Sequence, residues 1–288
     1  MKTLRLALAV ALAAFIIDGT VANAETYYSR ADANWSAQNT WSTVECGGDT
    51  AGVAQPGAND TAVICEGHTV DIDSTTGAVT VDTLVIEDSN TIDNHGTLNL
   101  EPDGSLEISR VLEMEYAHTH HGKITFSGTG GDDVGELKVG ADIVAHGLID
   151  VTSARGGTIS RAADGDILTL APEGRITAGT GDLTISAVIL NHGTVRANAA
   201  HTITIQTNAP DPGSGGCWEV TADGGVLRFN VATTIEAASG HFKVTAGTLE
   251  IYQDVTFSGG YQQTGGTLDV AQGKTFTVTG RYFDCPFN

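Results

Sequence analysis

The sequence is short of basic residues, aromatic residues and proline. Its 288 residues include 14 Lys and Arg against 35 Asp and Glu, 6% aromatic residues and 6 Pro. The resulting net charge of −21 repels nucleic acid and anionic membrane surfaces, so neither is expected as a partner. Beyond the first 24 residues no apolar run approaches the ~18 residues of a membrane span, which predicts no membrane insertion. The 3.6-residue apolar period of a long amphipathic helix is missing too, which favours an all-β chain.

Residues 1–24 have the pattern of a cleaved secretory signal. Lys2 and Arg5 precede the apolar stretch "LALAVALAAFII", and Ala22-Asn23-Ala24 fits the small-x-small cleavage rule. The predicted localisation is therefore secreted, either extracellular or at the cell surface. The mature chain would start at Glu25 with 12 basic against 34 acidic residues, a net charge of −22.

Four cysteines lie in the predicted mature chain. Their spacing matches no zinc or haem signature, and in an exported protein disulfides are the default expectation. Three pairings are open. We favour the one that staples each end of the domain, Cys46–Cys65 and Cys217–Cys285.

Short alternating stretches dominate the chain. Segments such as "TVDID", "KITF", "TITI" and "TFTV" alternate apolar with polar residues and are separated by Gly, Asn and Asp, which predicts many short strands. A Gly-x-Φ-x-Φ pattern, with Φ apolar, recurs eight times at steps of 26, 25, 27, 19, 32, 22 and 19 residues, starting at Gly96, Gly122, Gly147, Gly174, Gly193, Gly225, Gly247 and Gly266. We assign the 32-residue step to a loop insertion around residues 207–218.

A repeat of this length with two or three short strands is typical of one coil of a solenoid, whose stacked coils share a single core. The predicted fold is a single-stranded, right-handed parallel β-helix of about nine coils, with an antiparallel sandwich as the competing architecture. The expected organisation is a signal peptide (1–24), an N-terminal cap (25–60), the β-helix (61–278) and a C-terminal cap (279–288). Caps are expected because open solenoid ends expose unpaired strand edges.

The N-terminal part resembles known secreted proteins. The segments "NWSAQNTWS", "QPGANDTAVICEGHTVDID" and "VTVDTLVIEDSNTIDNHGTLNL" are similar to the start of many secreted bacterial β-helix proteins and to the eight-glycine extracellular domain. The later repeats resemble the passenger regions of autotransporters and adhesins. This resemblance implies a β-helix with a surface or adhesive role, and it implies no particular activity.

Histidines form the most conspicuous candidate site. His95, His121, His146 and His192 each precede a repeat glycine, and Glu173 fills the same position on one coil. Stacked on successive coils, they would form either a structural corner ladder or a metal-binding column. Glu115, His118 and His120 form a second candidate metal site, since the two histidines share a face of an extended strand. Acidic turns such as "GGDDVGE" offer oxygen ligands for Ca²⁺ as the one candidate ion, although solvated turns are the simpler interpretation.

An enzymatic alternative rests on a partial resemblance to polygalacturonases. Asp132, Asp133, His146 and Arg175 follow the order of that family's Gly-Asp-Asp, Gly-His-Gly and Arg-Ile-Lys segments. Inverting hydrolysis needs two carboxyl groups about 6.5–9.5 Å apart. No Asn-Thr-Asp segment precedes Asp132, Ala145 replaces a glycine, and Thr177 replaces the substrate-binding lysine.

The sequence therefore predicts a non-enzymatic structural or adhesion protein that binds glycans or other surface proteins. The alternatives are a polysaccharide-active hydrolase or lyase on the same scaffold, and a subunit that self-associates into an extracellular filament.

Overall fold

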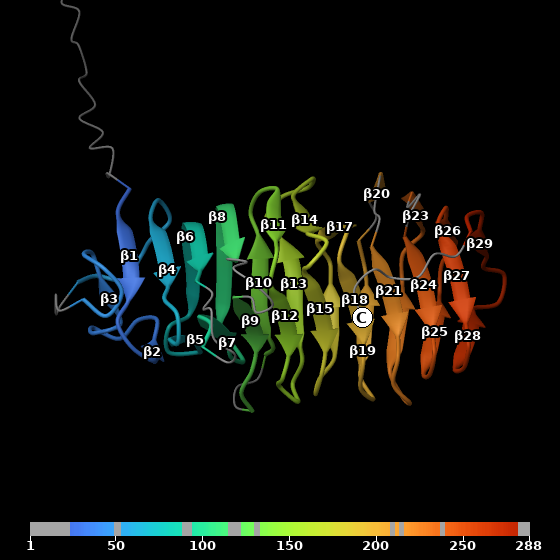
Figure 1. Cartoon of the computed structure of the whole chain (residues 1–288), viewed down its shortest axis with the longest axis horizontal. Coiled ribbons are helices and arrows are strands. Elements are labelled where there is room, and N and C mark those ends of the chain that lie inside the picture. The colour runs from blue at the N-terminus through green and yellow to red at the C-terminus, as the bar shows by residue number, and fades with distance from the viewer. Residues whose placement is uncertain are drawn as a thin grey trace, which may run out of the picture.

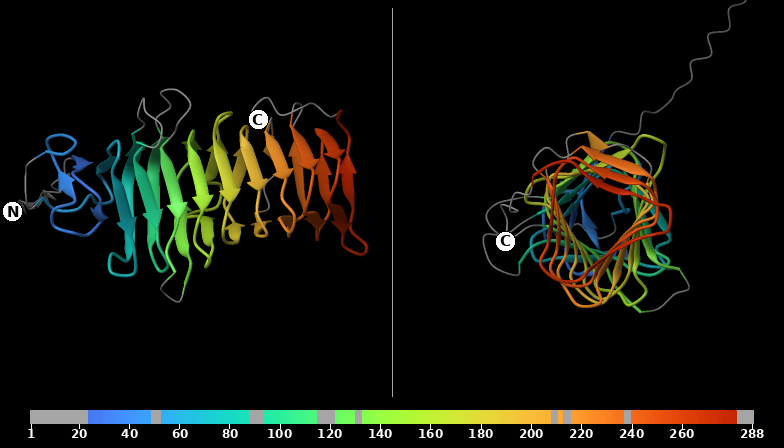
Figure 2. Two further views of the ribbon diagram at one scale, coloured as in Figure 1. Left: turned by 60° about the horizontal axis from the view of Figure 1, so that its bottom comes forward. Right: turned by 90° about the vertical axis from the view of Figure 1, so that its right-hand side faces the viewer.

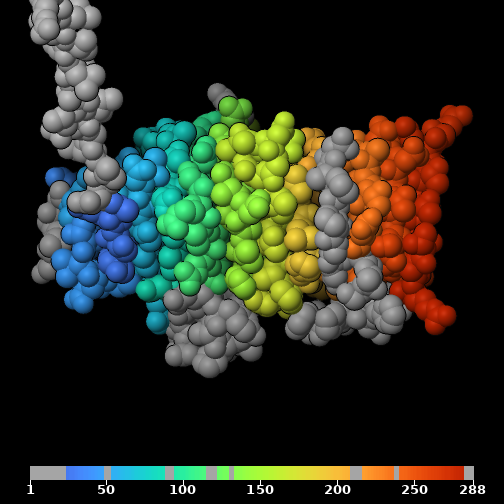
Figure 3. Space-filling view, turned by 90° about the horizontal axis from the view of Figure 1, so that it is seen from above, coloured from blue at the N-terminus to red at the C-terminus, as the bar shows by residue number. Residues whose placement is uncertain are grey.

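The computed structural model describes residues 24–48, 53–87, 94–114, 122–129, 133–207, 211–212, 216–236 and 240–281. These residues contain strands and turns but no helix, and almost all strand pairs are parallel. Successive coils follow one another along the long axis in chain order (Figures 1 and 3). The predicted all-β parallel solenoid is thereby confirmed.

Each full turn passes along three walls. The first wall consists of the first halves of β6 (Ala78–Ile86) and β8 (Ser105–Met114), then β10 (Gly135–Val139), β13 (Gly157–Arg161), β16 (Leu183–Ile185), β19 (Thr202–Ile205), β22 (Val226–Phe229), β25 (Thr248–Ile251) and β28 (Thr267–Val270). The second wall is a ten-stranded sheet of β2 (Ala33–Asn34), β5 (Thr69–Ile72), β7 (Thr97–Leu100), β9 (Lys123–Phe126), β12 (Leu148–Val151), β15 (Arg175–Ala178), β18 (Thr194–Ala197), β21 (Cys217–Val220), β24 (His241–Val244) and β27 (Gly260–Gln263). From β5 to β27 the chain enters this wall nine times, which makes eight full turns.

The third wall joins the other two. It contains β3 (Trp41–Ser42), β1 (Thr26–Ser29), β4 (Thr61–Ile64), the second halves of β6 and β8, β11 (Ile143–Ala145), β14 (Ile167–Leu170), β17 (Val188–Asn191), β20 (Asp211–Pro212), β23 (Thr233–Glu236), β26 (Val255–Phe257) and β29 (Phe276–Val278). β6 and β8 bend from the first wall into the third, with a register shift between Val81 and Thr83. Between β17 and β20 the wall changes from a three-stranded sheet to a four-stranded one.

One continuous core runs along the axis. Inward-facing residues of the second wall stack in register, for example Leu98, Ile124 and Ile149, all fully buried. Burying each such aliphatic side chain stabilises the fold by about 1.5–3 kcal/mol. Towards the C-terminal end the core becomes aromatic, where Trp218, Phe229, Phe242 and Phe257 contact one another. Outward positions alternate with these, as the sequence pattern predicts.

The strand registers correct the predicted glycine repeat. Second-wall strands are preceded by Gly96, Gly122, Gly147, Gly174, Gly193, Gly216, Gly240 and Gly259. The last three predicted glycines, at 225, 247 and 266, instead precede first-wall strands. The step from Gly193 to Gly216 is 23 residues, within the range of the others. The 32-residue step therefore arose because the predicted repeat switched from second-wall glycines to first-wall glycines. The two kinds of corner look alike in sequence because both use glycine.

Both corners require glycine for the same physical reason. A Cβ at Gly147 would overlap the carbonyl oxygen of Gly122, and one at Gly193 would overlap that of Gly174. At the first-wall corner, a Cβ at Gly247 would overlap the carbonyl oxygen of Gly225. Glycine is thus selected by the close approach of neighbouring coils rather than by turn conformation alone.

The N-terminal end is closed. Trp35 and Trp41 are fully buried, with ring centroids 4.6 Å apart, and the Trp41 indole N–H donates to the Trp35 carbonyl oxygen at 2.8 Å. β1 continues the parallel stack on β4, and β3 adds an antiparallel strand to its other edge. The disulfide Cys46–Cys65 ties this segment to the corner after β4 and confirms the predicted pairing.

The second predicted disulfide is only partly visible. Cys217 is disulfide-bonded, whereas Cys285 lies outside the described residues. The same holds for residues 1–23 of the predicted signal peptide and for residues 282–288 of the predicted C-terminal cap. Within the described part of the chain, no helix is long and apolar enough to cross a membrane.

Candidate functional site

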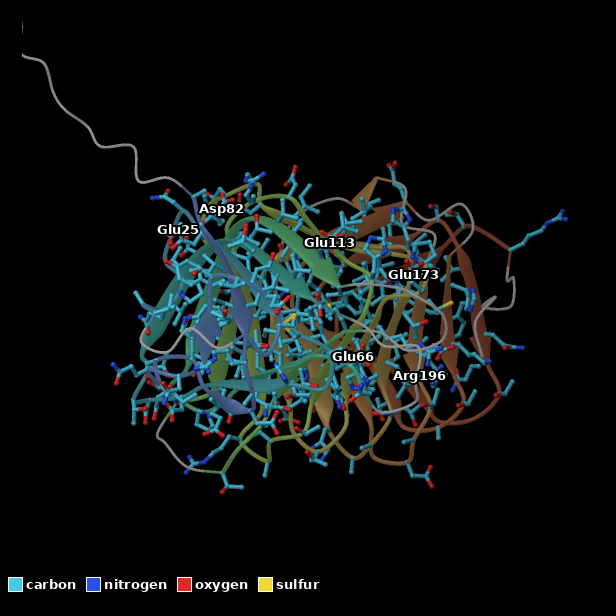
Figure 4. All side chains as sticks on the ribbon, turned by 60° about the vertical axis from the view of Figure 1, so that its left-hand side comes forward. Glu25, Glu66, Asp82, Glu113, Glu173 and Arg196 are labelled. Atoms are coloured by element: carbon cyan, nitrogen blue, oxygen red, sulfur yellow. A yellow bond between two sulfur atoms is a disulfide. The ribbon has the colours of Figure 1, made fainter. Side chains whose placement is uncertain are left out.

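The predicted histidine column lies at the corner where the chain enters the second wall. His95, His146 and His192 each come directly before a corner glycine and are half-buried, and Glu173 occupies the equivalent place. Glu173 is labelled in Figure 4. His121 lies outside the described residues. The described members therefore occupy equivalent positions at one corner of the solenoid.

Two members of the column, His146 and Glu173, are in direct contact. The Nδ1 atom of His146 lies 2.5 Å from Oε1 of Glu173 on the next coil, with the two side chains 42% and 23% exposed. Such a contact between equivalent positions of adjacent coils is what a corner ladder predicts. Among the described residues, none of the column histidines belongs to a group of three His, Cys, Asp or Glu whose donor atoms lie within 4.8 Å of one another.

The residues of the polygalacturonase-like set do not all meet. His146 and Arg175 lie on neighbouring coils at the same edge of the second wall, since Leu148 is opposite Arg175. Asp133 lies before β10, at the corner that enters the first wall, and its backbone N–H donates to the Asp103 carboxylate at 2.8 Å. The width of the second wall, one four-residue strand of about 13 Å such as β12, thus separates the Asp133 corner from the His146 corner. Asp132 lies outside the described residues, as do Glu115, His118 and His120.

A polar cluster that the sequence did not predict lies on the outer face of the second wall. Cys217 and Glu219 on β21 and His241 on β24 are 1–3% exposed, although strand alternation points them away from the core. Their donor atoms lie within 4.8 Å of one another. Glu219 also accepts from the Arg196 side chain on β18, at 2.6 Å to Nε and 2.5 Å to Nη2. Arg196 is labelled in Figure 4.

With Cys217 in a disulfide, this cluster stabilises the wall and has no free thiolate for metal binding or catalysis. A thiolate with a carboxylate and an imidazole would suit zinc or nucleophilic catalysis. Cys217, however, is disulfide-bonded, and the Glu219 carboxylate is already paired with a guanidinium. The second group of this kind in the described residues, Cys46, Cys65 and Glu87, is likewise built on a disulfide. Neither group resembles the oxygen-rich environment expected for Ca²⁺.

A small cavity marks the break in the third wall between β17 and β20. It has a volume of about 20 Å³ and is lined by Ile189, Ile205, Thr207, Trp218, Phe229, Thr233 and Ile235. The Trp218 indole N–H and the Thr207 hydroxyl are buried and have no hydrogen-bond partner among the described residues. This space accommodates about one water molecule and is far too small for a sugar ring.

Several charged side chains on the walls pair between neighbouring coils. Arg228 contacts Glu250 at 2.5 Å, Lys138 approaches Glu107 at 4.0 Å, and Arg110 contacts Asp82 at 2.5 Å. The hydrogen bond from the Arg110 guanidinium lowers the pKa of Asp82. Hydroxyl and amide groups also pair between neighbouring coils: Asn99 donates to Asp71 at 2.8 Å, and Thr177 donates to Asp150. These polar groups thus bind their neighbours on adjacent coils and do not converge on one cleft.

These features define the chain as a parallel β-solenoid with three walls, a capped N-terminal end and laddered lateral faces. No family model matches it, and no curated protein or solved structure shows significant similarity. The fold and the distribution of side chains therefore carry the functional argument.

Proposed function

We propose that the protein is a secreted or cell-surface structural or adhesion-type β-solenoid without catalytic activity. The supporting observation is the coil-to-coil pairing of polar side chains on the lateral walls. Catalysis needs acid, base and substrate-binding groups that converge on one place. Here the acidic side chains are distributed along the rod, and most of those named above are paired with a neighbour on the adjacent coil.

The second wall is the surface that we assign to ligand binding. Between β5 and β15 its outer face carries a column of short polar side chains in register: Asp71, Asn99, Thr125, Asp150 and Thr177. All except Thr125 are half-exposed. Carboxylate, amide and hydroxyl groups repeated at the ~4.8 Å strand spacing offer both donors and acceptors to the hydroxyls of a glycan. A flat, repetitive surface of this kind suits an extended polymer better than a small molecule.

Binding and catalysis are separated by one pair of assays. The purified mature protein is applied to a glycan array and, in parallel, incubated with acidic and neutral polysaccharides while reducing ends are measured. We expect glycan retention without release of reducing ends. Release that is lost in His146→Gln would instead establish the hydrolase alternative.

The binding surface is tested with two matched double variants. Asp71→Ala with Asp150→Ala removes two carboxylates from the second wall, and Glu107→Ala with Glu136→Ala removes two from the first wall. We expect the first variant alone to lose retention. Equal losses would show that net charge, not this surface, determines binding. Antibody labelling of the native protein on cells, in matrix and in medium tests the predicted localisation.

A further inference from the structure

The C-terminal end of the solenoid differs from the coil that precedes it. In the first wall Leu249 and Ile251 are fully buried, whereas Leu268 and Val270, their partners in register on β28, are half-buried. In the third wall Phe257 is fully buried and Val278, opposite it on β29, is half-buried. The last coil therefore presents its inward-facing apolar side chains at the end of the rod. Figure 2, right, looks onto this end.

The strand edges at this end are unpaired within the described residues. β27, β28 and β29 are each the last strand of their sheet. An edge of this kind carries a row of free N–H and C=O groups and normally requires protection by a charge, a proline or a cap. Residues 260–281 contain no proline, and β27 and β29 contain no charged residue; β28 has one, Asp269, which points outward.

Electrostatics also distinguishes this end. The whole chain has a net charge of −21, whereas residues 260–281 contain Asp269, Lys274 and Arg281, a net charge of +1. Two copies repel each other over most of their surface. At the C-terminal end the small local charge keeps that repulsion low.

The closed N-terminal end limits how two copies can meet. Among the described residues, its buried tryptophans, the two-residue edge strand β3 and the disulfide leave no open coil to receive the end of another rod. A head-to-tail contact, which would extend into a filament, therefore lacks one of its two surfaces. An end-to-end contact between two C-terminal ends uses the same surface twice and closes after two copies.

We propose that the C-terminal coil, β27 to β29, is a homodimer interface at which two rods join end to end about a two-fold axis. The axis pairs the exposed edges antiparallel and buries Leu268, Val270 and Phe276 of both copies in one continuous core. This replaces the predicted filament by a closed dimer. It does not depend on what the lateral walls bind.

Sedimentation equilibrium of the mature protein over a micromolar concentration range tests the interface. We expect twice the chain mass, together with a maximum dimension near twice that of one rod by small-angle X-ray scattering. Leu268→Lys would bury an ammonium group without a partner and should raise the dimer Kd by about a hundredfold. Thr277→Lys adds the same charge to the same coil at an exposed, outward-facing position, and should leave the dimer intact.

Circular dichroism confirms that both variants are folded. A monomeric wild-type protein, equal effects of the two lysines, or a mass that keeps increasing with concentration would each overturn the proposal. A wild-type monomer that dimerises only after removal of residues 282–288 would show that this segment, not a second copy, covers the end.

Discussion

The two ends of this solenoid solve the same problem in different ways. At the N-terminal end, two tryptophans fill the lumen, the edge strands are two residues long and a disulfide holds the cap in place. At the C-terminal end, the last described coil has four-residue and three-residue strands whose apolar side chains remain half-exposed. In a solenoid each coil contacts only its neighbours. A terminal coil therefore has a neighbour on one side only, and we propose that a second copy completes the contacts of the last described coil.

The largest expected effect is at the closed end. Trp41→Ala removes a fully buried indole and its hydrogen bond to Trp35, and should lower the free energy of unfolding by about 3–5 kcal/mol. Phe276→Ala is the matched change at the open end, where the ring is half-buried, and should cost about 1 kcal/mol in the monomer. Urea unfolding of both variants measures the difference. Equal costs would show that the two ends are packed alike.

Loss of the cap disulfide should be the next largest effect. Cys46 and Cys65 close a loop with a sequence separation of 19 residues, for which chain entropy predicts a stabilisation of about 3 kcal/mol. Cys46→Ser combined with Cys65→Ser should therefore lower the Tm. We expect hydrogen exchange to increase in β1 to β4 while β25 to β29 are unchanged. A uniform increase along the rod would contradict a local role for this disulfide.

Replacing a corner glycine in the middle coils should destabilise the protein more than replacing a glycine in the N-terminal cap. Gly147→Ala places a methyl group against the Gly122 carbonyl and the Met114 side chain, and overpacking of this kind costs about 1–3 kcal/mol. Gly57→Ala is the control, because its Cβ would meet only Asp60 Oδ2, at an ordinary 3.6 Å. Thermal unfolding compares the two. A smaller cost at Gly147 would mean that the coils separate easily to make room.

Acid should weaken the N-terminal half by a smaller amount. Burial tends to raise the pKa of Asp73, but hydrogen bonds from Thr75, Asn34 and Thr76 outweigh it and lower this pKa from 3.8 to about 2. Because the folded value is lower, the stabilisation is complete above pH 3.8 and is lost as the pH falls through 2. Asp73→Asn should therefore make stability less dependent on pH in this window, as followed by thermal unfolding. An unchanged pH profile would exclude the Asp73 turn as a source of acid sensitivity.

Sequence alone predicted the parallel solenoid because its signals are local. Each Gly-x-Φ-x-Φ unit reports an inward-outward alternation and a corner, and both depend on a few neighbouring residues. The phase of the repeat could not be predicted beyond Gly193, since Gly216 and Gly225 precede strands of different walls and face the same steric requirement.

Contacts in the candidate site were predictable only between residues at equivalent positions of adjacent coils. His146 and Glu173 meet because they occupy the same corner on adjacent coils. Glu219 and His241 were missed because alternation assigns them to the outside, and only the assembled structure shows that this part of the outer face is buried. Asp133 and His146 are close in sequence, but they lie at different corners because Asp133 precedes a first-wall strand and His146 precedes a second-wall strand.

The asymmetry of the ends is tested most directly by hydrogen exchange of the native protein at low and high concentration. We expect amides in β27 to β29 to exchange rapidly in dilute solution and to become protected as the concentration rises. Amides in β1 and β4 should be protected equally at both concentrations. Exchange at β28 that is slow and independent of concentration would contradict an open end that needs a second copy to complete it.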